Sequence, residues 1–414
     1  MNRFKLFTGL PVRLIGEVAL FQLLSYVFPL LSLPILSRML GIVEFGNLFW
    51  HISAVGLVGV LSNYAFDWSG TRELLRQSEP EGQLRALAPI LWSKFALALL
   101  GIALLLSIYF IGFLPQLELH LAALLMLEVA LSSWVPNIYF LARRETSKTV
   151  QFQLFARSVV LLGLGASLLL EVKLTAIDYA LLLVLSQAVL LVLSHGMLPK
   201  SVIRFAVAPN AIVSALRDGF PMFATFALTH AYTTSNVLFV GYFAGESEAG
   251  RFAAAAKLMG TVTQLLVGST SLVLFPGAVR AASSNEGQAV LRTNLRFVVT
   301  GGLLIAGLFT LFGGQMVSLV FGPQFFLSQG AATALGLLAL FVGISNAYGT
   351  QGLIAAGKES VVGLIIAAGA SVALLGHFYL DSRYGAEGGI AAWIAAEALV
   401  AALSIWAYYR FRSS

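Results

Sequence analysis

The chain has 414 residues, of which 58% are hydrophobic and only 11% charged, and its mean hydropathy is +0.88. Soluble domains carry roughly a quarter charged residues, so this composition excludes a protein that is dissolved by its own surface. The formal net charge is +6, and the chain has no cysteine, which excludes disulfides and thiolate metal sites.

Apolar runs of about 20 residues, the length that crosses ~30 Å of hydrocarbon, recur along the whole chain. They predict an all-α polytopic membrane protein with about 12 transmembrane helices. The first run is too long for a signal-peptide core and is expected to stay in the protein. In chain order the helices are predicted at 13–36, 45–68, 88–112, 119–141, 150–171, 177–198, 217–240, 250–275, 294–320, 328–356, 360–381 and 387–409.

The distribution of Lys and Arg predicts the orientation. One set of loops holds 18 basic residues, and the other set holds Arg38, Lys173, Arg251 and Arg383. Because basic residues accumulate in cytoplasmic loops, both termini are predicted to be cytoplasmic. The positive net charge follows from this pattern. No nucleic-acid partner is expected, since no cytoplasmic loop is long enough to form a binding domain.

A short motif recurs after 204 residues: Gly41-Ile-Val-Glu-Phe-Gly46 aligns with Gly245-Glu-Ser-Glu-Ala-Gly250. Each copy joins the first and second helix of a predicted half and is typical of a tight turn. Because six helices return the chain to its starting side, the halves are predicted to be parallel repeats, an N-terminal six-helix bundle at 1–205 and a C-terminal one at 206–414.

The predicted eighth helix carries a polar stripe in an apolar segment. Lys257, Thr261 and Gln264 follow at i, i+4 and i+7 and therefore share one face. A charge near mid-membrane costs ~2.5–3.5 kcal/mol, so it is expected to face a cavity, a partner or a substrate. The stripe is interpreted as a substrate-binding cavity wall. In the alternative, Lys257 snorkels to the interface, which leaves Thr261 and Gln264 unexplained.

Other polar residues inside the predicted helices are candidates for the same cavity, with hydrogen bonding between helices as the alternative for the uncharged ones. Arg157 suits an anionic head group, or its side chain snorkels to the cytoplasm. Glu128 and His230 are candidates for coupling transport to protons, whereas structural pairing is the alternative for Glu128 and Glu397. The further candidates for substrate binding are Gln22, Ser25, Tyr26, His230, Thr233, Thr234 and Asn236.

Four segments form a series of motifs along the chain: 63–74 with the preceding 29–41, Gly250-Arg-Phe-Ala-Ala-Ala-Ala-Lys257, Leu274-Phe-Pro276 and Tyr348–Lys358. Together they resemble the Wzx-type flippases of lipid-linked polysaccharide repeat units, in the polysaccharide transport family of the multidrug/oligosaccharidyl-lipid/polysaccharide exporter superfamily. The resemblance covers nearly the whole chain, and its strength lies in the order and spacing of loose motifs. One position departs from the pattern, since Ala65 stands where the family usually has glycine.

The resemblance implies two six-helix bundles around a central cavity that work by alternating access. The implied activity is translocation of polyprenyl-pyrophosphate-linked oligosaccharide across the bacterial inner membrane for O-antigen, capsule or exopolysaccharide synthesis. No bond need be made or broken, so neither a cofactor nor a catalytic residue is expected. Membrane lipid, a polysaccharide polymerase and a chain-length regulator are the implied partners.

Two other functions stay open at this point. A cation-coupled multidrug antiporter of the same superfamily would favour a cavity dominated by carboxylates. A membrane-embedded polysaccharide polymerase or sugar transferase would need a large extramembrane loop or an acidic nucleotide-sugar site. The predicted exterior loops are about a dozen residues or shorter, and the chain has neither Asp-x-Asp nor a glycine-rich phosphate loop.

Overall fold

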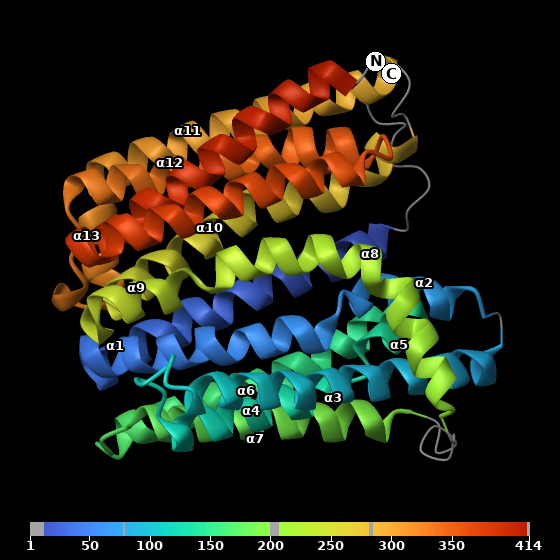
Figure 1. Cartoon of the computed structure of the whole chain (residues 1–414), viewed down its shortest axis with the longest axis horizontal. Coiled ribbons are helices and arrows are strands. Elements are labelled where there is room, and N and C mark those ends of the chain that lie inside the picture. Colours follow the sequence, from blue (N-terminus) through green and yellow to red (C-terminus); the bar gives the residue numbers. More distant parts are fainter. Residues whose placement is uncertain (1–11, 78, 144, 199–206, 281–284, 412–414) are drawn as a thin grey trace. The chain divides into compact units, whose positions relative to one another are not determined.

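The structure, a computed structural model, describes residues 12–77, 79–143, 145–198, 207–280 and 285–411. All regular structure in these ranges is helical, which confirms an all-α multi-pass membrane protein (Figure 1). Among the described residues, 8 helices are long and apolar enough to cross a membrane, or up to 9 with the bent segment from Pro209 to Ala244. The count of about 12 crossings and the two six-helix bundles stay predictions.

The helices alternate with short connections. In chain order they are α1 (Val12–Asn63), α2 (Phe66–Leu75), α3 (Pro80–Phe110), α4 (Leu119–Ser133), α5 (Asn137–Ala142), α6 (Thr146–Leu169), α7 (Ala176–Gly196), α8 (Pro209–Thr234), α9 (Asn236–Ala244), α10 (Glu246–Arg280), α11 (Asn285–Phe321), η3 (Pro323–Phe325), α12 (Gln329–Ser345), η4 (Asn346–Ile354) and α13 (Glu359–Phe411).

Glycines turn the chain inside the two longest helical elements. Gly41 (φ 77°) divides α1, and Gly385 (φ 56°) divides α13, so each element contains two of the predicted helices. Gly245 (φ 91°) forms the connection between α9 and α10. Backbone at such positive φ is readily adopted only by glycine. Both copies of the repeated motif therefore begin at a left-handed glycine, which confirms the predicted turns.

The described chain forms two compact units. The N-unit consists of Val27–Leu40 and Asn47–Leu238, and the C-unit contains Gly41–Gly46 and the chain from Phe239 onward, with the start of α1. These units differ from the predicted halves 1–205 and 206–414, because α8 packs with the N-unit and the first copy of the motif packs with the C-unit. The predicted halves describe an internal repeat, and this repeat stays a prediction.

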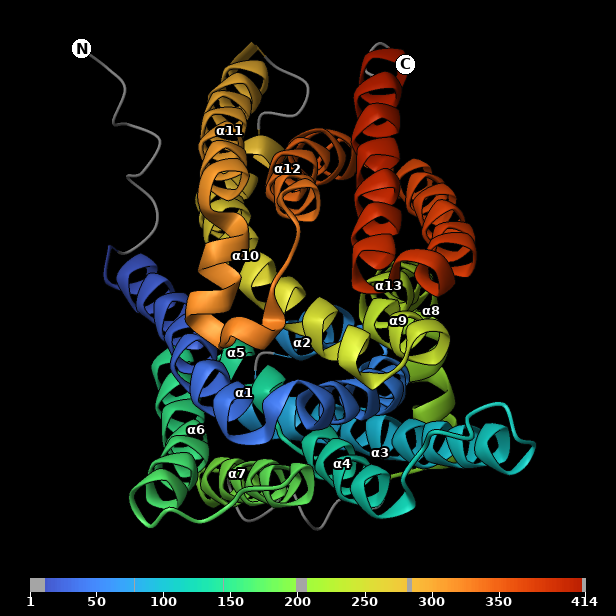
Figure 2. The same ribbon diagram turned by 90° about the vertical axis from the view of Figure 1, so that its left-hand side faces the viewer.

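In the N-unit, α7 packs against both α4 and α6, and α2 packs against α3, α5 and α8 (Figures 1 and 2). Apolar residues at helical spacing form the core around α2, α3 and α5. Phe66, Leu74, Leu87 and Phe140 are almost fully buried there. Their burial fixes α2 and α5 at one end of the unit, next to the pocket described below.

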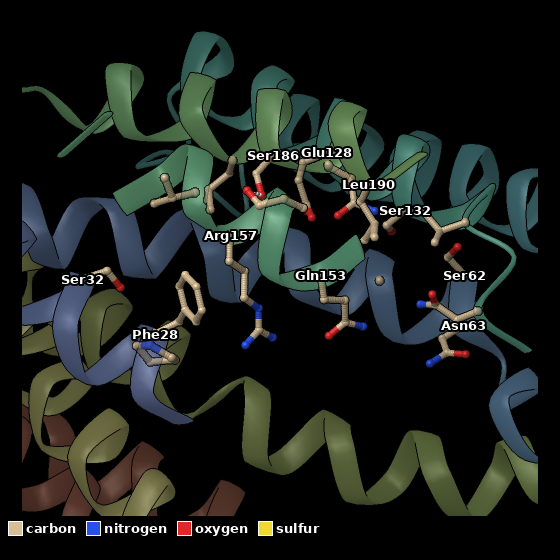
Figure 3. Close-up of a pocket in the computed structure, with 18 of the residues that line it drawn as sticks. Phe28, Ser32, Ser62, Asn63, Glu128, Ser132, Gln153, Arg157, Ser186 and Leu190 are labelled. Atoms are coloured by element: carbon tan, nitrogen blue, oxygen red, sulfur yellow. Dashed lines mark hydrogen bonds between the residues drawn. The ribbon is translucent and has the colours of Figure 1, made fainter. Parts of the chain in front are cut away.

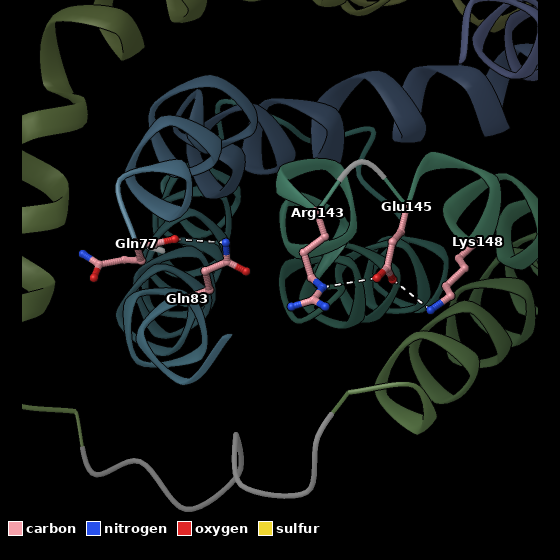
Figure 4. Close-up of polar contacts among 5 residues, drawn as sticks. All are labelled: Gln77, Gln83, Arg143, Glu145 and Lys148. Atoms are coloured by element: carbon pink, nitrogen blue, oxygen red, sulfur yellow. Dashed lines mark hydrogen bonds and ion pairs between the residues drawn. The ribbon is translucent and has the colours of Figure 1, made fainter. Parts of the chain in front are cut away.

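The connections at that end carry polar contacts (Figure 4). The Glu145 carboxylate accepts hydrogen bonds from Lys148 (2.8 Å) and Arg143 (3.2 Å). The hydrogen bond from Lys148, aided by Arg143, lowers the pKa of the Glu145 carboxyl. This contact therefore stabilises the fold above the unfolded pKa of the carboxyl and is lost as the pH falls through the lowered value. In the neighbouring connection, Gln83 donates to the carbonyl oxygen of Gln77 (3.2 Å).

The predicted helix 45–68 is wrong at its end, because the helix stops at Asn63 and α2 starts at Phe66. Tyr64 (φ 50°) and Ala65 (φ 54°) between them lie in the left-handed region. For an L-residue this conformation costs roughly 1–2 kcal/mol. The backbone at Ala65 is therefore strained. Ala65 stands at the position where the family that this chain resembles usually has glycine.

We expect Ala65→Gly to stabilise the protein by about 1 kcal/mol, because glycine adopts the left-handed region without a steric penalty. The measurement is thermal unfolding of the purified protein in detergent. Ala88→Gly is the matched control, since Ala88 is buried within helical α3 and glycine there should lower the midpoint. Equal or lower stability of Ala65→Gly would show that the break is not strained.

Candidate functional site

A polar pocket of about 550 Å³ lies inside the N-unit. Its volume falls within the range of small-molecule sites, roughly 300–1,000 Å³. Residues of α1, α2, α3, α4, α6 and α7, together with those around the start of α5, line it. Its polar lining consists of Ser32, Ser62, Asn63, Asp67, Lys94, Glu128, Ser132, Asn137, Gln153, Arg157, Tyr179, Ser186 and Gln187.

Arg157 and Gln153 stand one turn apart on α6 and point into the pocket (Figure 3). Their spacing of four residues puts them on one helix face. Phe152 and Ala156, beside them in the sequence, are buried, so the packing of α6 orients the two polar side chains. Ser186 of α7 donates to the carbonyl oxygen of Ala156 (2.7 Å). This bond links α7 to α6 immediately beside Arg157.

A second basic residue, Lys94 of α3, also lines the pocket. Ser62 donates to the carbonyl oxygen of Lys94 (3.0 Å), which fixes α1 against α3 at this level. An acidic residue, Asp67, lies in the same region of the pocket. Its Oδ2 accepts a hydrogen bond from the side-chain amide of Asn63 (2.9 Å) across the break between α1 and α2. The strained turn therefore places a carboxylate and an amide at the edge of the pocket.

The remaining charged residue of the lining is Glu128 on α4. Ser132 follows it by one turn, and Ser186 and Leu190 of α7 lie nearby (Figure 3). The pocket thus combines two basic groups, two carboxylates and many uncharged donors. Guanidinium and ammonium groups bind phosphate through charge-assisted hydrogen bonds. Within the described residues no group of three His, Cys, Asp or Glu side chains is placed to hold a metal.

Two of the predicted site residues, Arg157 and Glu128, lie in this pocket. The stripe of Lys257, Thr261 and Gln264 lies in the C-unit instead. Lys257 and Gln264 are exposed on α10, whereas Leu258 and Leu266 are buried. Thr261 is half-buried and donates to the carbonyl oxygen of Lys257 (2.9 Å). The stripe is therefore one accessible helix face, and its role in binding stays a prediction.

The other predicted residues lie at the end of α8 and the start of α9. Thr233 donates to the carbonyl oxygen of Thr229 (2.9 Å), and the ring of His230 lies against that of Phe226 in a tilted arrangement (4.1 Å between centroids, 43° between planes). The carbonyl oxygen of Thr234 accepts from Ser53 of α1. Asn236 is buried. These residues do not line the pocket. Gln22, Ser25 and Tyr26 lie outside the residues whose side chains the structure describes.

Sequence reasoning missed Gln153, Asn63, Asp67 and Lys94 as site residues. A signal existed for two of them, since Gln153 precedes Arg157 by one helical turn and Lys94 is one of three basic residues inside the predicted helices. Asn63 and Asp67 lie on either side of the break between α1 and α2, and both line the pocket.

His51, buried in α1, has a structural role. Its Nδ1 lies 2.9 Å from the carbonyl oxygen of Asn47, and its Nε2 accepts from the backbone N–H of Glu118 (2.7 Å). Asn47 in turn donates to the Glu118 carboxylate (2.7 Å). Both ring nitrogens of His51 are therefore engaged in hydrogen bonds, with the proton on Nδ1. These bonds fix the position of Glu118, the residue that precedes α4.

The helical architecture and the polar pocket define a multi-pass membrane protein with a transporter fold. The structure of "Lipid II flippase MurJ, inward closed conformation" is similar, with a TM-score of 0.69, 16% identity, and coverage of 94% of this chain and 86% of that one. An inward-facing multidrug resistance MATE family transporter of the MOP superfamily has a TM-score of 0.66 and 12% identity, over 94% of this chain and 98% of that one.

Residues 15–281 match the family model described as "Polysaccharide biosynthesis protein". The chain therefore belongs to this family. It is also 25% identical to a "Putative O-antigen transporter" of Shigella dysenteriae, over 91% of this chain and 94% of that protein. A protein of Escherichia coli (strain K12) with the same description is 22% identical, over 94% of each chain.

Proposed function

We propose that this protein flips a lipid-linked oligosaccharide across the bacterial inner membrane by alternating access. The observation that carries the proposal is a pocket with two basic side chains and many uncharged donors, inside an otherwise apolar helical unit of a polysaccharide biosynthesis protein. The names of the similar proteins, O-antigen transporters and a lipid II flippase, support the same activity.

The proposed substrate is a polyprenyl-pyrophosphate-linked oligosaccharide, which presents phosphates, many hydroxyls and an apolar tail. Arg157 and Lys94 match the phosphates, and Gln153, Gln187 and Ser132 match the hydroxyls. The pocket volume suits part of a head group rather than the whole lipid. We assign the exposed stripe around Lys257 on α10 as a further polar surface for the same substrate.

The proposed orientation has both termini in the cytoplasm, as the distribution of Lys and Arg predicts. The connections after α2 and after α5 belong to the same predicted cytoplasmic set. Both connections appear together in Figure 4, at the end of the N-unit where α2 packs against α5. The substrate would be loaded from this side and released on the other, where a polysaccharide polymerase and a chain-length regulator would act on it.

Deletion of the gene tests the proposal. Cells without the protein are expected to accumulate lipid-linked intermediates on the cytoplasmic side and to lose long-chain surface polysaccharide. Gel analysis of surface polysaccharide and extraction of the intermediates measure both effects, with the plasmid-borne gene as the control. Normal polysaccharide in a strain without a second flippase, or a changed susceptibility to drugs alone, would contradict the proposal.

A further inference from the structure

A second pocket of the N-unit, with a volume of about 310 Å³, lies where α2, α3 and α8 meet. It shares no lining residue with the pocket around Arg157. The lining residues of α8 follow at helical spacing from Ala211 to Gly219, and those of α3 from Ala86 to Ile90, so each helix presents one face. The second pocket is therefore a separate cavity within the same unit.

The inner part of its lining is apolar and tightly packed. Phe66 and Ile90 are buried there. A Cβ at Gly219 would lie 3.4 Å from the hydroxyl oxygen of Ser69 and from the Tyr64 ring, so α8 lies close against α2 at this point. By contrast, both arginines of the lining and its aspartate are exposed. The second pocket therefore has an apolar floor and a charged rim.

Two charges of opposite sign at the rim have no ion-pair partner. Arg76 pairs with Glu73 within α2 (2.9 Å). Among the described residues, neither Arg72 of α2 nor Asp218 of α8 forms an ion pair, although both line the same pocket. The Asp218 carboxylate accepts a hydrogen bond from Ser214, one turn earlier (3.3 Å). The second pocket thus offers a cation and an anion, on two different helices, to a ligand.

We propose that the second pocket binds the head group of phosphatidylethanolamine, a membrane phospholipid that carries a phosphate and a primary ammonium group on a two-carbon link. Arg72 donates to the phosphate oxygens, and Asp218 accepts from the ammonium N–H groups. The charged lining comprises two arginines and two carboxylates, so its formal charge is zero, which favours a zwitterion over an anion. The volume suits a head group and not a complete lipid.

Apolar residues beside the rim suit the rest of a lipid. Trp68 precedes Arg72 by one turn of α2, Phe220 follows Asp218 on α8, and both rings are exposed. Tryptophan is typical of the membrane–water interface. The Lys and Arg distribution predicts that the end of α2 and the start of α8 face the cytoplasm, so the second pocket lies at the level of the cytoplasmic head groups. These surroundings favour a membrane lipid over a soluble phosphate compound.

A lipid bound here bridges two helices, because Arg72 belongs to α2 and Asp218 to α8. Tyr64, just before α2, already stacks on Phe223 of α8 (4.1 Å between centroids). The bound head group therefore adds to the packing of α8 on α2, and the folded protein gains stability in its presence. The inference concerns lipid binding and does not depend on which substrate the protein transports.

The first test measures lipid binding by native mass spectrometry of the full-length, delipidated protein. The probes are phosphatidylethanolamine, phosphatidylglycerol, which lacks the amine, and phosphatidylcholine, whose amine has no N–H, all with the same acyl chains. We expect phosphatidylethanolamine to bind about tenfold or more tightly than the other two, since a hydrogen bond to a charged group contributes about that factor. Equal binding of the three lipids, or tighter binding of phosphatidylglycerol, would overturn the proposal.

Three variants assign the binding to this pocket. Arg72→Gln should weaken phosphatidylethanolamine binding about tenfold or more, and Asp218→Asn should abolish the preference over phosphatidylglycerol. Arg72→Lys, which keeps the charge, should retain part of the affinity. The matched control is Arg85→Gln, since Arg85 of α3 is exposed but lies outside the pocket. Unchanged binding in Arg72→Gln, or an unchanged preference in Asp218→Asn, rejects the second pocket as the site.

The second test is thermal unfolding in detergent. Without lipid, Arg72→Gln and Asp218→Asn should unfold at the temperature of the unaltered protein, since both side chains are exposed. Phosphatidylethanolamine should raise the midpoint of the unaltered protein but not that of Arg72→Gln. Soluble phosphoethanolamine, the head group alone, should stabilise the protein far less, and equal stabilisation would overturn the assignment to a lipid. The comparison of the three lipids on the unaltered protein decides the proposal even where a variant is unstable.

Discussion

Replacement of Arg157 by alanine is expected to reduce the yield of long-chain surface polysaccharide by about tenfold or more. The guanidinium points into the N-unit pocket from α6 (Figure 3), where it would bind a phosphate of the substrate. A hydrogen bond to a charged group contributes roughly 1.5–3 kcal/mol, and each 1.4 kcal/mol is a factor of about ten in affinity. Complementation of the deletion strain, scored by polysaccharide length, measures the effect.

Two further variants define what the loss means. Arg157→Lys keeps the charge but loses the planar fork, so it should restore part of the activity. Arg85→Ala is the control for removing an arginine, because Arg85 pairs with Glu81 on the surface (2.9 Å) with both side chains 66% exposed. We expect cells that express Arg85→Ala to make a normal amount of long-chain surface polysaccharide. Normal polysaccharide in cells that express Arg157→Ala would place the substrate outside this pocket.

The second large effect is expected at Gly46. A Cβ there would collide with the carbonyl oxygen of Glu246 and would lie 2.7 Å from the backbone nitrogen of Gly250. Backbone atoms cannot move aside as a flexible side chain can. Gly46→Val should therefore destabilise the C-unit by roughly 1–3 kcal/mol or more and deplete the protein from the membrane, with polysaccharide lost in proportion.

Protein level in membranes and thermal unfolding in detergent test this expectation. Gly46→Ala should give an intermediate defect, since alanine introduces the colliding atom alone. Gly260→Ala on α10 is the control, because a Cβ at Gly260 would meet nothing within 4 Å. An unchanged unfolding temperature for Gly46→Val would contradict the close approach of Gly46 to the backbone of Glu246 and Gly250.

The sequence predicts the helices well because a bilayer requires long apolar segments. It also predicts the turns at Gly41 and Gly245, since the repeated glycines mark them. The break at Ala65 could not be foreseen, because alanine ordinarily favours a continuing helix. The departure from the family's glycine was visible, but tertiary packing decides which conformation alanine must accept there.

The candidate site was predictable only in part. Arg157 and Glu128 can each be identified in the sequence as a charged residue inside an apolar helix. The hydrophobic periodicity of the helices, however, does not indicate which helices face each other. The pocket depends on how α6 and α7 meet, and that contact is set by packing and by the bond from Ser186 to Ala156.

The break between α1 and α2 has a mechanical consequence. It turns the Tyr64 ring onto Phe223 of α8, with centroids 4.1 Å apart and planes tilted by 14°. Asn63 and Asp67, on either side of the break, belong to the wall of the pocket. The stacked rings therefore tie α8 to the break, and we expect a displacement of α8 to be transmitted to the two pocket residues beside it. By this contact, a helix that contributes no residue to the pocket lining is coupled to the pocket wall.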